Sequence, residues 1–153
     1  MKKITFLKTF IQTRWLHNFK SRKALENYQK KQLAAYMDFL KRESPYFKNG
    51  VPHDFDHMDK AFMMTHFNEL NTQGVDRDEA LALAIESEKT RNFTELKGEI
   101  AVGLSSGTSG HRGLFITTEK ERSMWAAAIL AKMLPKGQLF GHRIAFFLRA
   151  DNE

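Results

Sequence analysis

Residues 99–118 constrain the fold of this chain more than any other stretch, because two strand-like patterns flank a short polar segment. Residues 99–104 alternate apolar with small or polar side chains, and this period of two predicts a β-strand. The sequence GLFITT, residues 113–118, predicts a second strand. The two strands would form a β-hairpin joined by SSGTSGHRG, residues 105–113.

The composition of this connecting segment suits the binding of an anion. Its three glycines allow a tight turn that presents backbone N–H groups, and its four hydroxyl side chains add further donors. It is not a Walker A loop, because no lysine follows Gly110 and a strand rather than a helix comes next. Linkers and ordinary hairpin turns share this composition, so the segment alone leaves a polyphosphate loop and a structural turn both open.

Several segments, in the same order along the chain, resemble one enzyme family. SSGTSG resembles the Ser/Thr/Gly-rich phosphate loop of adenylate-forming enzymes, whose usual form reads SSGTTGKPK. The other segments resemble the branch that holds phenylacetate–CoA ligase-like enzymes and the capsular-polysaccharide and deazaflavin-cofactor adenylating groups. These segments are SPYFK at 44–48, residues 60–72 (similar to "K…nF..LNT"), ESEKTRNF, VGLSSGTSG and RIAFFLRA.

The resemblance spans most of residues 25–150 and corresponds to the N-terminal part of such an enzyme. It implies an α+β or α/β fold, with N-terminal helices followed by a hairpin bearing a phosphate loop, a helix and a buried strand. The resemblance predicts a truncated adenylation domain over residues 24–153, and the charge and helical spacing of residues 1–23 predict a basic amphipathic helix ahead of it. The remainder of the enzyme chain, with the adenine-binding and metal-binding motifs and a catalytic lysine, would be a partner of this piece.

The activity that the resemblance implies is activation of a carboxylic acid by ATP with Mg²⁺, giving an acyl-adenylate and pyrophosphate; CoA can then accept the acyl group. The residues that match the phosphate loop, and would bind the nucleotide, are Ser105, Ser106, Gly107, Thr108, Ser109, Gly110, His111 and Arg112. The family's K-P-K is replaced here by His111-Arg112-Gly113, so the positive charge would come from Arg112 or from elsewhere. The resemblance places no catalytic residue within these 153 residues, which alone we expect to be inactive.

The end of the sequence supports an incomplete domain independently of the resemblance. Residues 143–150 contain the continuous apolar run Ile144–Leu148, which predicts a strand buried on both faces of a sheet. Such a strand needs covering helices, and only a few residues follow it. We expect either that a partner covers it or that the natural protein continues.

The net charge of +6 is concentrated at the N-terminus, since residues 1–23 hold seven Lys and Arg and no acidic residue. Within them, Ile4, Leu7, Ile11, Trp15 and Phe19 recur at helical spacing. The segment could dock on the rest of the enzyme, lie on a membrane surface or bind a nucleic-acid backbone. Docking or a solvated basic face is favoured, and nucleic acid is the least favoured partner. The alternative to an enzyme fragment is a small non-catalytic module that binds a membrane or a partner through this helix.

Other features bound the remaining possibilities. The chain has no cysteine, no secretory signal and no apolar run of membrane-spanning length, so cytoplasmic residence is the default expectation. Residues 21–43 predict an amphipathic helix, and Asp76–Glu79 and Thr118–Glu121 predict two further helix starts. The hydroxyls cluster in one loop without a neighbouring base, which argues against a Ser/His/Asp triad. Two His-Asp pairs, at 53–54 and 56–57, do not have a metal-ligand spacing, and no metal site is predicted.

Overall fold

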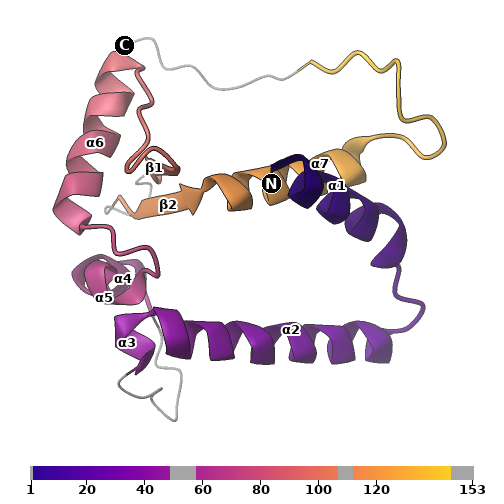
Figure 1. The fold of residues 1–153 in the computed structure, drawn as a ribbon, viewed down its shortest axis with the longest axis horizontal. Helices are drawn as coiled ribbons and strands as arrows, with labels where there is room; N and C mark the ends of the chain where they lie inside the picture. Colours follow the sequence, from indigo (N-terminus) through magenta and orange to yellow (C-terminus); the bar gives the residue numbers. More distant parts are fainter. Residues whose placement is uncertain (1, 49–57, 107–111, 146–153) are drawn as a thin grey trace. The chain divides into compact units, whose positions relative to one another are not determined.

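The computed structural model describes residues 2–48, 58–106 and 112–145. Over these residues the protein is mixed α+β, with seven α-helices, one π-helical turn and a two-stranded antiparallel sheet (Figure 1). The elements in chain order are α1 (Lys2–Ile11), η1 (Gln12–Leu16), α2 (Arg22–Glu43), α3 (Pro45–Lys48), α4 (Lys60–Thr65), α5 (Phe67–Leu70), α6 (Arg77–Thr90), β1 (Ile100–Leu104), β2 (Leu114–Thr118) and α7 (Glu119–Met133).

The chain divides into two compact units. Unit 1 combines Met1–Asn18 with Ser123–Glu153, and unit 2 is the continuous stretch Phe19–Arg122. The boundary falls in the first turns of α7. The mixed α+β class expected from the sequence is confirmed at this level.

In unit 2, the helix predicted over residues 21–43 is present as α2. The Ser21 hydroxyl accepts a hydrogen bond from the Ala24 amide at 3.2 Å, and so caps the first turn. The helix ends at Glu43 with Ser44 as its C-cap, before Pro45, as the sequence predicts. Ser44 is fully buried, and its hydroxyl donates to the Glu69 carbonyl at 2.9 Å, which ties the end of α2 to α5.

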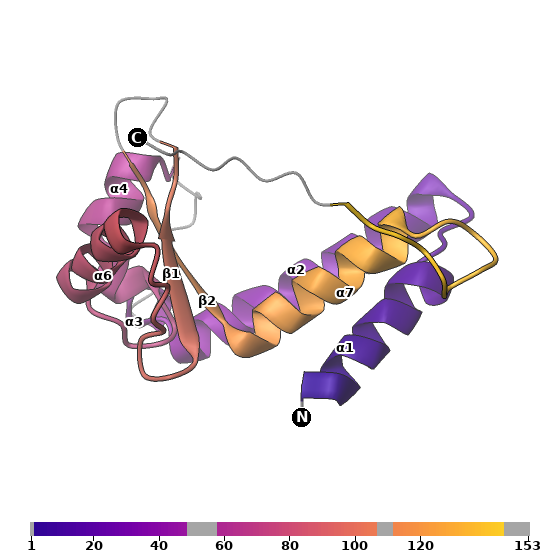
Figure 2. The same cartoon turned by 90° about the horizontal axis from the view of Figure 1, so that it is seen from above.

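The hairpin predicted at residues 99–118 is also confirmed. Strands β1 and β2 pair in antiparallel register from Ile100 opposite Thr118 to Leu104 opposite Leu114. Helix α6 packs beside the hairpin (Figure 2). Its Ala80 and Ala84, four residues apart, are buried on the face toward the sheet, where small side chains allow a close approach. The core of unit 2 consists of Phe67, Val75, Ala80, Ala84, Leu96, Ile100 and Leu114.

The two predicted helix starts have the caps that the sequence indicates. The Asp76 carboxylate accepts from the Asp78 and Glu79 amides at 2.9 and 3.1 Å and opens α6. These hydrogen bonds, with that of Glu79 foremost, lower the pKa of Asp76. At α7, Thr118 and Glu121 cap each other reciprocally, each backbone amide donating to the other side chain.

In unit 1, an arginine joins η1 to the C-terminal end of α7. The Arg14 guanidinium donates to the carbonyls of Ala131 at 2.9 Å and Leu134 at 2.8 Å, and also to that of Pro135. These carbonyls belong to or follow the last turn of a helix, where no backbone amide satisfies them. Arg14 therefore caps α7, which gives this basic residue a structural role that the sequence did not indicate.

Two segments differ from the sequence-based expectation. The N-terminal helix reaches only Leu16, and Arg22 and Lys23 belong to α2, because Ser21 starts a new helix. The described beginning of the predicted final strand, residues 143–145, is not in a strand, and Ile144 is 49% exposed. The rest of that segment lies outside the described residues.

Candidate functional site

The site begins at the loop end of the hairpin, where β1 ends at Leu104 and β2 begins at Leu114. One residue beyond this last pair, the Ser105 amide donates to the Gly113 carbonyl at 2.8 Å. The Gly113 amide in turn donates to the Ser105 hydroxyl oxygen at 2.7 Å. These two hydrogen bonds, which we call the Ser105–Gly113 clasp, fix the two ends of the segment between them.

Arg112 braces this clasp and links it to α6. Its Nε donates to the Ser105 carbonyl at 3.1 Å, and its two terminal nitrogens donate to the two carboxylate oxygens of Glu88, one of them at 2.7 Å. The Arg112 hydrogen bond lowers the pKa of Glu88, and the same contact raises the pKa of Arg112. Both side chains remain nearly half exposed, so the pair is accessible to a ligand.

The structure places three of the eight residues that match the phosphate loop. Ser105 and Arg112 lie at the base of the segment, and Ser106 follows the clasp with its side chain exposed. Gly107, Thr108, Ser109, Gly110 and His111 lie outside the described residues. Arg112, one possible source of the positive charge expected for the loop, lies at its base and is engaged by the Glu88 carboxylate.

A cavity of about 460 Å³ opens beside the clasp, within unit 2. Its lining is almost entirely apolar, with Lys60, Asn71 and Ser105 as the polar side chains. It is formed by Lys60, Met63, Met64, Phe67, Leu70, Asn71, Ser105, Gly113, Leu114, Phe115 and Ile116. Helices α4 and α5 thus provide one wall, and β2 with the clasp provides the other.

Two contacts tie the clasp to the α4 wall. The Lys60 side chain crosses Gly113 so closely that a Cβ on this glycine would lie 3.3 Å from the Lys60 Cγ and Cδ atoms. The Leu114 amide donates to the Met64 sulfur at 3.2 Å. A larger residue at position 113 would press on the lysine stem, which would have to shift by a few tenths of an ångström.

Asn71 holds the α5 wall in shape. Its amide nitrogen donates to the carbonyls of Phe67 at 2.8 Å and Val75 at 3.1 Å. Its side-chain oxygen accepts from the Gln73 amide at 3.1 Å and the Val75 amide at 3.0 Å. One side chain thereby satisfies four backbone groups of the turn that leads from α5 to α6.

On β2, Phe115 lies opposite Gly103 in the register, and its ring covers this glycine. A Cβ on Gly103 would lie only 2.3 Å from the ring's Cζ atom. The ring also lines the cavity. Gly103 therefore allows Phe115 to lie flat across the strands at the cavity edge, a cross-strand contact that stabilises a glycine in a strand.

In the part of the chain that is described, no group of three or more His, Asp or Glu side chains could bind a metal ion. His53, Asp54, Asp56 and His57, which sequence spacing already argued against as ligands, lie outside the described residues. The candidate site is thus the base of the loop, with the Ser105–Gly113 clasp and the Arg112–Glu88 pair, beside an apolar cavity.

Sequence reasoning missed Glu88, Lys60 and Met64, which complete the surroundings of the loop. Glu88 lies 24 residues from Arg112 in sequence, and Met64 lies 50 from Leu114. No periodicity or motif connects such pairs. Asn71 was within the segment that resembles the family's "LNT", although no role could be assigned to it from the sequence.

Comparisons of this chain with protein-family models, with curated proteins and with solved structures found no match.

Proposed function

We propose that residues 105–112 bind the β- and γ-phosphates of ATP, as the phosphate loop of an adenylate-forming ligase that activates a carboxylic acid. The observation that carries this proposal is the Ser105–Gly113 clasp, which closes a hydroxyl- and glycine-rich segment at the end of a hairpin. The sequence resemblance supplies the reaction class, and the clasp supplies the physical support.

The clasp supports phosphate binding because it restricts the two ends of the loop before a ligand arrives. A segment held at both ends loses less conformational entropy on binding than an unrestrained linker of the same composition. The hydroxyls of Ser106, Thr108 and Ser109, with the backbone amides around Gly107 and Gly110, would donate to the phosphate oxygens. No covalent step is required of these residues.

Arg112 gives the loop a charge that depends on its partner. While Glu88 accepts both terminal guanidinium hydrogen bonds, the pair is close to neutral overall. A phosphate chain competes with Glu88 for the guanidinium, whose planar fork suits phosphate oxygens as well as carboxylate oxygens. Arg112 would then orient the pyrophosphate leaving group, an electrostatic and positioning role.

Mg²⁺ would enter with the nucleotide, since this ion binds proteins chiefly through phosphates and few side chains, and it would offset the charge of the triphosphate. The donor set fits this arrangement, because hydroxyl and amide groups dominate the loop. In the proposed reaction a carboxylate attacks the α-phosphorus, the bond to the β-phosphate oxygen breaks, and pyrophosphate leaves. CoA is the acceptor proposed for the acyl group afterwards.

The test is release of pyrophosphate from MgATP by the natural gene product at its full length, across a panel of carboxylic acids. We expect acid-dependent release that falls about a hundredfold or more in a Thr108→Ala, Ser109→Ala double variant. Thr94→Ala is a matched control, because this exposed threonine lies outside the loop and we expect it to leave the rate unchanged. Absence of release with every acid, from a folded protein, would leave the loop as a structural turn.

A further inference from the structure

The net charge of the protein lies entirely in unit 1. Unit 2 contains sixteen Lys and Arg and sixteen Asp and Glu, so its net charge is zero. Unit 1 contains eight Lys and Arg but only two acidic residues, Asp151 and Glu153, so it carries the whole +6. This asymmetry points to a negatively charged partner for unit 1 alone.

Helix α1 presents an apolar stripe on its exposed side. Ile4, Leu7 and Ile11 are 75%, 58% and 39% exposed, while Phe6 and Phe10 on another side are less exposed and stack on each other. At 100° per residue, the three exposed aliphatic residues fall within a sector about 60° wide. Large aliphatic side chains aligned on an exposed helix face indicate a surface that binds another apolar surface.

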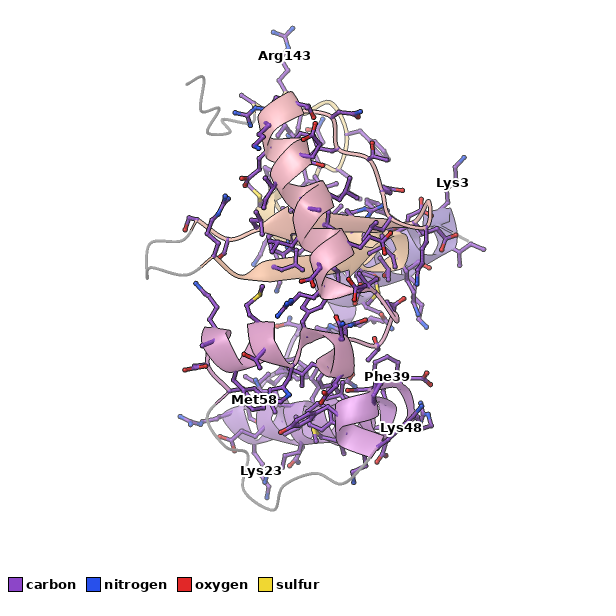
Figure 3. All side chains as sticks on the ribbon, turned by 90° about the vertical axis from the view of Figure 1, so that its left-hand side faces the viewer. Lys3, Lys23, Phe39, Lys48, Met58 and Arg143 are labelled. Carbon is purple, nitrogen blue, oxygen red and sulfur yellow. The ribbon has the colours of Figure 1, made fainter. Side chains whose placement is uncertain are left out.

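Lysines flank this stripe on both sides. Lys3 and Lys8 fall about 40° beyond its two edges, and both are exposed. Figure 3 shows the Lys3 side chain extending away from its helix. A stripe of aliphatic residues bordered by lysines is the pattern of a helix that lies in the plane of a bilayer interface, its stripe among acyl chains and its lysines at the headgroups.

Unit 1 also contains a basic cavity of about 420 Å³. It is lined by Thr13, Arg14, Trp15, Ala131, Lys132, Leu134, Lys136 and Gly137, and none of these is acidic. Trp15 is exposed and lines the cavity, and its ring packs edge-on against Phe10 of α1, so it lies between this helix and the cavity. Tryptophan favours the headgroup region of a membrane, and the cavity beside it holds the exposed lysines 132 and 136.

We propose that unit 1 binds the surface of an anionic phospholipid bilayer, with Ile4, Leu7 and Ile11 inserted and Lys132 and Lys136 at the lipid phosphates. The charge of unit 1 complements such a surface, and it opposes pairing with a second copy of the same basic unit. A nucleic-acid duplex would satisfy the lysines but would leave the aliphatic stripe exposed. No helix among the described residues is long and apolar enough to span a membrane.

The test is sedimentation of the full chain with vesicles of phosphatidylcholine alone and with about 30% phosphatidylserine. We expect binding only with phosphatidylserine, and weaker binding at high salt. An Ile4→Ser, Leu7→Ser variant should bind about tenfold or more weakly, since it removes two inserted side chains. In a Lys132→Gln, Lys136→Gln variant, the affinity for these vesicles should fall about fivefold for each lysine removed.

Matched controls come from α2, whose Leu33 and Tyr36 are 59% and 56% exposed. Leu33→Ser with Tyr36→Ser should leave vesicle binding unchanged, as should Lys30→Gln with Lys31→Gln. Circular dichroism establishes that each variant is folded. Binding that does not depend on phosphatidylserine, or that the α2 variants reduce equally, would overturn the proposal.

Other occupants of this surface give distinct results. Self-association of the chain, abolished by Ile4→Ser, Leu7→Ser without any vesicle binding, would assign the stripe to a second copy. Binding of a DNA duplex that competes fully with vesicles and survives Ile4→Ser, Leu7→Ser would assign unit 1 to nucleic acid. If inorganic phosphate displaces the protein from vesicles more strongly than a non-binding salt of the same ionic strength, the basic cavity would be a site for free phosphate and not for lipid. Each of these outcomes contradicts the proposal, and none depends on the ATP loop of unit 2.

Discussion

Replacing Asn71 tests how the wall of the cavity is stabilised. In Asn71→Ala, the carbonyls of Phe67 and Val75 and the amides of Gln73 and Val75 lose their side-chain partner. Three of these four contacts are partly buried, so water can replace them only in part. Val75 itself is 2% exposed, and its neighbourhood is the core of unit 2.

The size of the effect follows from these contacts. A hydrogen bond of this kind stabilises the folded state by about 0.5–1.5 kcal/mol. Three partly buried bonds therefore give an expected loss of about 2–3 kcal/mol in the free energy of unfolding for Asn71→Ala. Asn71→Asp keeps an acceptor for the two amides but directs a carboxylate oxygen at two carbonyls, so at neutral pH it should destabilise at least as much.

The assay is urea unfolding of the full chain followed by circular dichroism, with the midpoint and the slope compared between variants. Asn92→Ala is the matched control, since among the described residues its side chain accepts one exposed hydrogen bond, from the Thr94 hydroxyl at 3.4 Å. The midpoint of this variant should not change. A loss below about 0.5 kcal/mol for Asn71→Ala would refute the argument, because the four contacts would then contribute nothing beyond solvent.

Three further predictions follow from single contacts. The Ser87 hydroxyl is buried without a hydrogen-bond partner among the described residues. Ser87→Ala should therefore leave the free energy of unfolding in urea unchanged or raise it by up to about 1–2 kcal/mol. A clear loss of stability would show that the hydroxyl has a partner. The pKa of Glu88 is lowered, so the Arg112 pair contributes stability above the ordinary glutamate range and loses it as pH falls through the lowered pKa. Carbon NMR should show the Glu88 carboxyl titrating below its usual range and returning to it in Arg112→Gln; equal values in both proteins would refute the pairing. Arg14→Met should speed hydrogen exchange in the last turn of α7, whose carbonyls it leaves without a partner, and Arg22→Met, which removes an exposed arginine from α2, should not.

Local rules account for the elements that the sequence predicts. Alternation of side chains over residues 99–104 gives the hairpin, because one face of the strands packs on α6 and the register follows from that face. Ser21, Asp76 and Thr118 start helices because their side chains satisfy nearby amides, a relation that spans only two or three residues. Each of these signals lies within one element.

The candidate site depends on contacts that no local rule contains. Arg112 finds Glu88 because α6 packs against the hairpin, and Lys60 covers Gly113 because α4 lies beside β2. From the sequence, Arg14 is one more positive charge in the basic N-terminal segment. The carbonyls that it caps are more than a hundred residues away along the chain. These pairs form because of tertiary packing, and a single sequence does not show which distant residues pack together.

Titration calorimetry of this chain with magnesium tripolyphosphate, MgATP and AMP tests the phosphate loop most directly, because the loop is proposed to contact only the β- and γ-phosphates. We predict that tripolyphosphate and ATP bind, that AMP binds much more weakly, and that Thr108→Ala, Ser109→Ala reduces the first two affinities by about tenfold or more. Equal binding of the three ligands, or unchanged affinity in the double variant, would contradict the assignment of residues 105–112 as a phosphate loop.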